Sequence, residues 1–86
     1  MRIRFHRNFE KQYKKFSAKT KAKIRERLSL FLRDEFDPIL NNHPLRGKYG
    51  GYRSINISGD LRAVYKLSDQ EIRVFVAVAT HNTLYK

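Results

Sequence analysis

A histidine follows the last apolar run of the sequence, and histidine is the side chain best suited to proton transfer at neutral pH. His81 comes directly after "VFVAVAT" (74–80), and Asp60 lies in the short polar stretch "SGD" (58–60). Imidazole titrates near pH ~6.5 and serves as a general acid or base, while a neighbouring carboxylate can orient it. Asp60 and His81 are therefore a candidate acid–base pair, although aspartate also favours turns in its own right.

Arg62 interrupts an otherwise apolar stretch, "LRAVYKL" (61–67). A guanidinium group matches phosphate in a bidentate fork, so Arg62 could hold a scissile phosphate and stabilise charge in its transition state. The alternative is an ordinary strand residue that faces solvent or pairs with an acid of the next turn. Other cations that could join it lie close by in the sequence: Arg46, Lys48 and Arg53.

Tyrosines near these residues could stack on the bases of single-stranded RNA, or could equally be half-buried packing residues: Tyr49, Tyr52 and Tyr85. We expect neither a metal nor another cofactor. Three histidines, no cysteine and no His-x-x-x-His spacing make a poor ligand set. The stretch "GKYGG" (47–51) lacks the strand-to-helix context of a phosphate-binding loop.

The periodicity of the chain predicts the elements that must position these side chains. Residues 2–6 alternate as a strand does, and Phe9, Tyr13 and Phe16 mark one face of a helix. Ser17 is a plausible N-cap for a second helix over 18–36, which ends before Pro38. The apolar side of that helix is expected to comprise Ile24, Leu28, Phe31, Leu32 and Phe36.

The second half of the chain reads as a polar loop (41–51) followed by three strands, at 52–57, 61–67 and 72–79. The order β-α-α-β-β-β predicts a single α+β domain, residues 1–86, with two N-terminal helices packed on a small curved antiparallel sheet. Antiparallel pairing across "SDQE" (68–71) places residue 60 near residue 78. Pairing across the preceding turn places Asn56 near Leu61, so Asn56, Asp60 and His81 should gather at one end of the sheet.

Charge is the strongest compositional signal. Nineteen Lys and Arg residues against eight Asp and Glu give a formal net charge of +11. Such a charge favours a polyanionic partner, either nucleic acid or an acidic protein. No apolar run is long enough for a membrane span or a signal peptide, so we expect a soluble cytoplasmic protein without a membrane partner.

Two segments resemble the RelE/ParE superfamily of toxin–antitoxin toxins, in particular its YafQ-like branch of mRNA interferases. "HPLRGKYGGYRSINISGDLRAVYK" (43–66) is similar to the His-Pro-Leu…Gly-Tyr-Arg…Gly-Asp-Trp…Tyr-Lys run of that branch. "ATHNTLY" (79–85) resembles its Gly-Thr-His…Leu-Phe ending. Arg62 matches the arginine of the Asp-Tyr-Arg-Val-Tyr pattern in RelE-like toxins.

The resemblance implies a RelE-like fold and a toxin that cleaves mRNA in the ribosomal A site, by attack of the RNA 2′-OH and without metal. Carried over residue by residue, the catalytic positions are His43, Asp60, Arg62, His81 and Tyr85. The positions that bind substrate or line the site are Arg46, Lys48, Arg53 and Asn56. The implied partners are the ribosome, mRNA and an acidic, partly disordered antitoxin that forms a hetero-oligomer with the toxin.

Three departures from the YafQ-like pattern keep other functions open. Asn56 stands in place of a second histidine, Leu61 in place of a tryptophan and Ala77 in place of an arginine. Asparagine cannot act as a general base, and alanine cannot neutralise a phosphate. Either Arg62 and Arg53 supply the missing charge, or the protein is a weakened toxin that acts as a binding module. A ParE-like inhibitor of DNA gyrase is the second alternative.

Overall fold

The computed structural model describes residues 1–85, and its element order confirms the predicted α+β class. Single-turn 3-10 helices occur at Pro38–Leu40 and Gly47–Tyr49. None of the helices in residues 1–85 is long and apolar enough to span a bilayer. The other elements are β1 (Arg2–Phe5), α1 (Arg7–Lys14), α2 (Ala18–Arg33), β2 (His43–Pro44), β3 (Arg53–Ser58), β4 (Leu61–Leu67), β5 (Ile72–Thr80) and α3 (His81–Leu84).

Helix α2 begins as predicted. The Ser17 side chain accepts a hydrogen bond from the backbone N–H of Thr20, which satisfies one of the free donors at the helix start. The helix buries Ile24, Leu28 and Phe31 against the sheet. The Phe31 ring packs edge-on against two sheet residues, with centroid distances of 4.9 Å to Tyr65 and 5.2 Å to Phe75.

The predicted end of this helix is wrong. Helix α2 stops at Arg33, because the Asp34 side chain accepts a hydrogen bond from the Phe36 N–H and so offers the backbone an alternative to the helical pattern. As a result Phe36, which we expected on the apolar face, is 61% exposed. Leu32 is also exposed, so the buried face of α2 is narrower than predicted.

The five strands form one sheet in the order β1-β5-β4-β3-β2. All neighbours pair antiparallel except β1, which lies parallel to β5, so the predicted antiparallel sheet is mixed at this edge. No hairpin joins these two strands, and a hairpin is what would force an antiparallel pair. Beyond β1, helix α1 covers the free edge of β5. Asn8 donates to the Val76 carbonyl, and Gln12 accepts from the Val78 N–H.

The β4–β5 register differs from the prediction by three residues near the turn at 58–60. Leu61 pairs with Thr80, whereas pairing of residue 60 with 78 would have placed Leu61 opposite Ala77. Part of the difference lies in the 68–71 turn, where the Asp69 carboxylate accepts from the N–H groups of Glu71 and Ile72. The rest is a bulge in β5 opposite Val64 and Tyr65. The shift brings His81 even closer to Asp60 than predicted.

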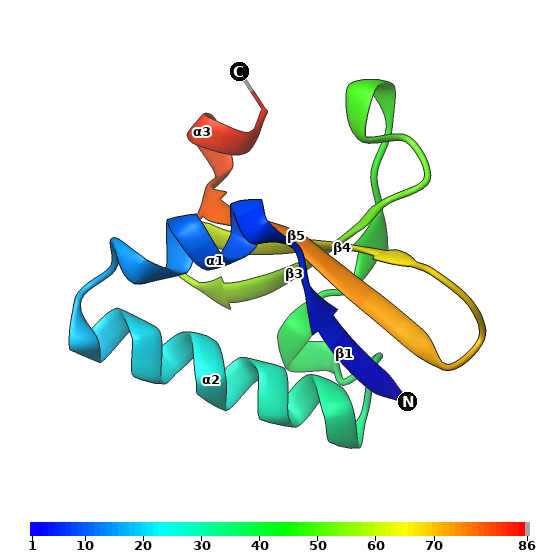
Figure 1. Cartoon of the computed structure of the whole chain (residues 1–86), viewed down its shortest axis with the longest axis horizontal. Coiled ribbons are helices and arrows are strands. Elements are labelled where there is room, and N and C mark those ends of the chain that lie inside the picture. Colours follow the sequence, from blue (N-terminus) through cyan, green and yellow to red (C-terminus); the bar gives the residue numbers. More distant parts are fainter. Residues whose placement is uncertain (86) are drawn as a thin grey trace.

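The two faces of the sheet carry different structures. Figure 1 shows α2 on one side of the sheet. On the other side lie α3 and the segment between β2 and β3. The helix side holds the main core, with Ile55, Ile57, Tyr65 and Phe75 fully or almost fully buried. The other side holds a smaller cluster, formed by Val64, Ala77, Ala79 and Leu84. The segment 41–51, which we predicted to be a loop, contains the short strand β2 and a 3-10 turn.

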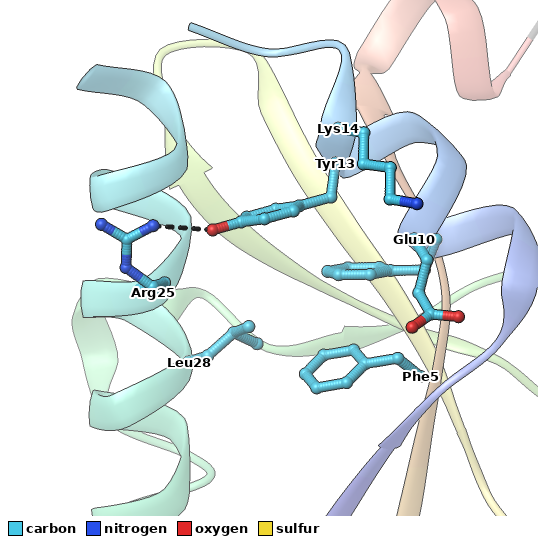
Figure 2. A pocket seen from close by; sticks show the side chains of 7 residues that line it. Phe5, Glu10, Tyr13, Lys14, Arg25 and Leu28 are labelled. Atoms are coloured by element: carbon cyan, nitrogen blue, oxygen red, sulfur yellow. Dashed lines mark hydrogen bonds between the residues drawn. The ribbon is translucent and has the colours of Figure 1, made fainter. Parts of the chain in front are cut away.

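An apolar hollow of about 380 Å³ opens between β1, α1 and α2. In Figure 2 the side chains of Phe5 and Leu28 point toward each other across it. Arg25 closes one end by donating to the Tyr13 hydroxyl at 2.7 Å. Phe5 is 44% exposed, although its ring packs against that of Phe9 with centroids 4.9 Å apart.

Candidate active site

A second hollow, of about 440 Å³, lies on the sheet face away from α2. Polar atoms make up most of its lining, in contrast to the hollow between the helices. It contains five of the predicted site residues, which come from three separate parts of the chain: His43, Arg46, Arg62, His81 and Tyr85. Four further residues complete the lining: Asn41, Pro44, Leu45 and Ser54.

The histidine of β2 has a defined protonation pattern. The His43 Nδ1 lies 2.8 Å from the backbone carbonyl oxygen of Asn41. Because a carbonyl oxygen can only accept a hydrogen bond, Nδ1 carries the proton, and in the neutral ring Nε2 is left with its lone pair. Asn41 presents this carbonyl from a left-handed backbone conformation, with φ at 45°. His43 can therefore accept a proton through Nε2.

Asn42 anchors this segment from the opposite face of the sheet. Its amide donates to the Tyr65 hydroxyl at 2.8 Å and to the Glu35 carbonyl at 3.0 Å, and its oxygen accepts from Arg53 at 2.8 Å. All three side-chain hydrogen bonds of Asn42 thus point toward the helix side, while His43, the next residue, lines the hollow. Within β2, His43 pairs with Ser54 on the hollow side, whereas Pro44 pairs with Arg53, since successive side chains of a strand point to opposite faces.

A compact ionic cluster lies beneath Asn42. Arg73 forms an ion pair with Glu35 at 3.1 Å, and the Tyr65 hydroxyl donates to the same carboxylate at 2.7 Å. Burial alone would raise the pKa of Glu35, but the hydrogen bonds from Arg73 and Tyr65 hold it below its ordinary value. Burial raises the pKa of Tyr65 to about 12. The hydrogen bond and the negative charge of Glu35 also raise this pKa, whereas the hydrogen bond from Asn42 lowers it. At neutral pH, Glu35 is therefore ionised and Tyr65 is protonated.

Arg62 is held on the hollow side of β4. Its Nη1 donates to the carbonyl of Gly59 at 2.8 Å and to that of Leu61 at 3.2 Å. Within residues 1–85 no carboxylate pairs with it, and its Nε and Nη2 groups make no hydrogen bond. A fixed guanidinium with free donors that line a polar hollow can receive an anion such as a phosphate.

His81 begins the single turn of α3, which the sequence did not predict. The Thr80 hydroxyl caps this turn by accepting from the Thr83 N–H. The predicted proximity of Asp60 and His81 is present in the backbone, since the His81 N–H donates to the Asp60 carbonyl at 2.8 Å. However, no hydrogen bond in the described chain joins the Asp60 carboxylate to the His81 ring. The ring instead packs on Tyr85, with centroids 4.7 Å apart.

Three buried polar atoms on this face have no hydrogen-bond partner among residues 1–85: Ser54 Oγ, Asn56 Oδ1 and the Tyr85 hydroxyl. Ser54 and Tyr85 line the hollow, and Asn56 pairs across the ladder with Arg62. Buried polar groups are normally satisfied, because desolvation without a hydrogen bond costs about 1–3 kcal/mol. In this conformation these atoms are sealed from solvent, so a polar ligand would reach them only after the side chains that cover them move.

Four predicted residues lie outside the lining of the hollow. The Arg53 guanidinium is on the other face, bonded to Asn42 and 5.4 Å from the centre of the Phe36 ring, so it cannot reach a phosphate in the hollow. Lys48 lines a neighbouring hollow, and Asp60 is exposed. Asn56 lies beside the site, as its pairing with Arg62 requires.

Sequence reasoning missed Asn41, Asn42 and Ser54. The stretch "NNHP" (41–44) did contain a signal, since asparagine tolerates the left-handed conformation that Asn41 adopts. Nothing in the sequence indicated that Asn42 would reach Tyr65, which lies 23 residues further along the chain.

Comparison with known proteins places this geometry in a family. The family model for YafQ, a bacterial toxin of type II toxin–antitoxin systems, matches residues 1–86. The mRNA interferase toxin YafQ of Escherichia coli strain K12 is 36% identical over 47 residues, which cover 55% of this chain and 50% of that protein. The aligned region thus spans half the length of that relative.

Solved structures agree in fold along nearly the whole chain. The crystal structure of YafQ from E. coli strain BL21(DE3) superposes with a TM-score of 0.82 at 22% identity, and covers 99% of this chain and 98% of that one. The E. coli DinJ–YafQ toxin–antitoxin complex gives a TM-score of 0.79 at 24% identity, with 99% and 97% covered. These likenesses confirm the RelE-like fold. Together with the family match, they establish that the chain belongs to the YafQ family of type II toxin–antitoxin toxins.

Proposed function

We propose that this toxin is a ribosome-dependent endoribonuclease that cleaves mRNA in the hollow between β2, β4 and α3. The observation that carries the proposal is the convergence of two imidazoles, His43 and His81, in one polar hollow with the Arg62 guanidinium, which pairs with no carboxylate of residues 1–85. Phosphodiester cleavage needs a base, an acid and a cation near the phosphate, and these three side chains can supply them. The name of the E. coli relative, an mRNA interferase toxin, supports this choice of substrate.

In the proposed reaction, His43 acts as the general base. Its free Nε2 removes the proton from a ribose 2′-OH, and the 2′-oxygen forms a bond to the adjacent phosphorus. The bond from phosphorus to the 5′-oxygen breaks, and His81 donates a proton to that oxygen as it leaves. The products are a 2′,3′-cyclic phosphate and a free 5′-OH, so atoms and charges balance without another reactant.

Arg62 and Tyr85 complete the site. The free Nε and Nη2 donors of Arg62 would bind the non-bridging phosphate oxygens and stabilise the charge that develops on them. The Tyr85 hydroxyl is buried without a protein partner among residues 1–85, and it would donate to the same group or to the ribose after a small movement of the side chains that cover it. Because Arg53 is bonded to Asn42, it does not replace the charge missing at Ala77, and Arg62 and Arg46 remain to do so.

The ribosome would supply the remaining binding energy. Arg46 and Lys48 are exposed around the site, and lysines crowd the first turns of α2. Contacts of these cations with RNA phosphates release counterions, so we expect activity on the ribosome to fall steeply with salt. The proposed location is the cytoplasm, where translating ribosomes are found.

The test is single-turnover cleavage of a defined mRNA on programmed ribosomes. We expect His81→Ala and His43→Ala each to slow cleavage by roughly 10²–10⁴-fold, the usual contribution of a general acid or base. Asn82→Ala is the matched control, because Asn82 is exposed in the same helical turn but does not line the hollow. Cleavage by His81→Ala at the wild-type rate would remove His81 from the reaction.

An acidic antitoxin is the protein partner that we propose. The DinJ–YafQ complex is a toxin–antitoxin pair with this toxin fold, and the net charge of +11 favours an acidic segment. The apolar hollow of Figure 2, with Lys14 and Arg25 among its lining residues, would accept the apolar side chains of such a segment. Phe5→Asp should then weaken antitoxin binding in calorimetry more than Lys11→Gln, which changes the net charge equally on the exposed side of α1. Equal effects would place the antitoxin elsewhere.

A further inference from the structure

A third hollow lies further along the same sheet face as the candidate active site. Its volume is about 330 Å³, and its lining is half polar and half apolar. Two tyrosines and two lysines dominate the lining, which contains no carboxylate among the described residues: Tyr49, Tyr52, Lys48 and Lys66. His6, Asn8, Val76 and Ala77 complete it.

A row of aromatic rings connects the linings of the two hollows. Tyr85, which lines the candidate active site, packs edge-on against Tyr49 at 5.9 Å, and Tyr49 packs edge-on against Tyr52 at 6.0 Å. On β4, the side chains of Arg62, Val64 and Lys66 alternate onto this face, so Lys66 is about 13–14 Å from Arg62 along the strand. A ligand that extends from Arg62 along the sheet therefore passes the tyrosines and reaches Lys66.

The cations of this hollow form no ion pair among the described residues. In residues 1–85 neither Lys48 nor Lys66 forms a salt bridge, and both are exposed. Lys48 instead lies over the Tyr49 ring, with its Nζ 5.4 Å from the ring centre. Ala77 contributes a small side chain to the lining of this hollow.

We propose that this hollow binds the nucleotide next to the scissile step, with its base against Tyr49 and Tyr52 and its phosphate near Lys48 and Lys66. The proposal rests on the nuclease function and adds to it a second nucleotide subsite. Aromatic faces accept any base, and lysines bind phosphate as point charges, so the subsite adds affinity without strict sequence preference. An acidic peptide would use the lysines but would leave the tyrosine faces without a planar partner.

The test uses oligoribonucleotides with 2′-O-methyl groups, which bind but cannot be cleaved. Binding of a dinucleotide and of a tetranucleotide to the purified toxin is followed by backbone amide chemical shifts and by titration at low salt. The dinucleotide should shift the signals of Arg62 and His81. The tetranucleotide should in addition shift those of Tyr52, Lys66 and Ala77, and bind roughly fivefold to a hundredfold more tightly, as one stacked base provides.

Two variants sharpen the comparison. Lys66→Gln removes a phosphate contact and should reduce the gain from dinucleotide to tetranucleotide, while Lys11→Gln, an equal loss of charge on α1, should keep it. Ala77→Leu, which fills the hollow with an apolar side chain, should also abolish the gain.

Any of the following results would contradict the proposed nucleotide subsite. A tetranucleotide that shifts the same signals as the dinucleotide, or an unchanged gain in Lys66→Gln, would contradict it and leave the nuclease function intact. Failure of both oligonucleotides to bind would contradict it as well, whereas the nuclease function is judged separately, by cleavage on the ribosome.

Discussion

Removal of one hydroxyl group, in Tyr65→Phe, tests whether the cluster under Asn42 holds the candidate site in place. The hydroxyl accepts from Asn42 at 2.8 Å and donates to the Glu35 carboxylate at 2.7 Å. Phenylalanine keeps the ring contacts with Phe31 and Phe75, so the change isolates these two hydrogen bonds.

The expected cost follows from the two bonds. A neutral hydrogen bond contributes about 0.5–1.5 kcal/mol and one to a charged group about 1.5–3 kcal/mol, so the free energy of unfolding should fall by roughly 2–4 kcal/mol. A domain of this size has a total stability of about 4–13 kcal/mol, so such a loss is large. Glu35 keeps its ion pair with Arg73, and the variant should therefore still fold.

Urea denaturation at neutral pH measures this loss. Tyr13→Phe is the matched control, since it also removes one tyrosine hydroxyl, which accepts from Arg25 at an exposed position and should cost less than about 1 kcal/mol. Amide exchange adds a second readout. The Leu45 N–H, which donates to the Tyr52 carbonyl beside the site, should exchange faster in Tyr65→Phe. Equal stabilities of the two variants would refute the anchoring role of Tyr65.

Three further predictions follow from the same geometry. Because the pKa of Glu35 is lowered in the folded state, its stabilising effect is complete above its unfolded pKa of about 4.5 and is lost as pH falls through the lower folded value. Glu35→Gln should therefore lose less stability than wild type between pH 7 and pH 3 in urea titrations, and parallel curves would contradict this. Asn41→Gly should leave thermal stability almost unchanged, whereas Asn41→Ala should lose about 1–2 kcal/mol at the left-handed position, and equal losses would argue against strain there. Arg62→Gln should slow cleavage on the ribosome by roughly a hundredfold or more, and Arg62→Lys should restore part of the rate; a wild-type rate in Arg62→Gln would exclude phosphate binding by this residue.

Helix caps and the alternation of polar and apolar residues predicted several helix and strand boundaries correctly. Ser17 caps α2 as expected, and the strand at 61–67 has the predicted bounds. The polar side chains that bend or end an element were harder to interpret. Asp34 ends α2 early, Asp69 lengthens the β4–β5 turn, and Thr80 starts a helical turn, each through a side-chain hydrogen bond to a nearby backbone N–H.

The sequence predicted which residues form the candidate site better than it predicted the contacts among them. Asp60 and His81 are close together, as the predicted meander requires, but the hydrogen bond between them joins their backbones. The observed β4–β5 register differs from the predicted one, and the register decides which side chains face each other. Arg53 lies on the opposite face because side chains alternate along β3 and Ile55 and Ile57 face the core. The sequence could not show its bond to Asn42, which holds the guanidinium there. Nor could it show the hydrogen bond from His43 to Asn41, which leaves Nε2 of His43 as the proton acceptor.

The central claim is that the hollow around His43, Arg62 and His81 cuts translated mRNA. The most direct measurement is a map of RNA 5′ ends in cells after induction of the wild-type toxin or of His81→Ala, recorded together with growth. We expect growth arrest with new 5′-OH ends at defined codon positions within translated frames for the wild type, and neither for His81→Ala. Growth arrest by the wild type with intact mRNA and inhibited DNA gyrase would contradict it and favour a ParE-like mode of action.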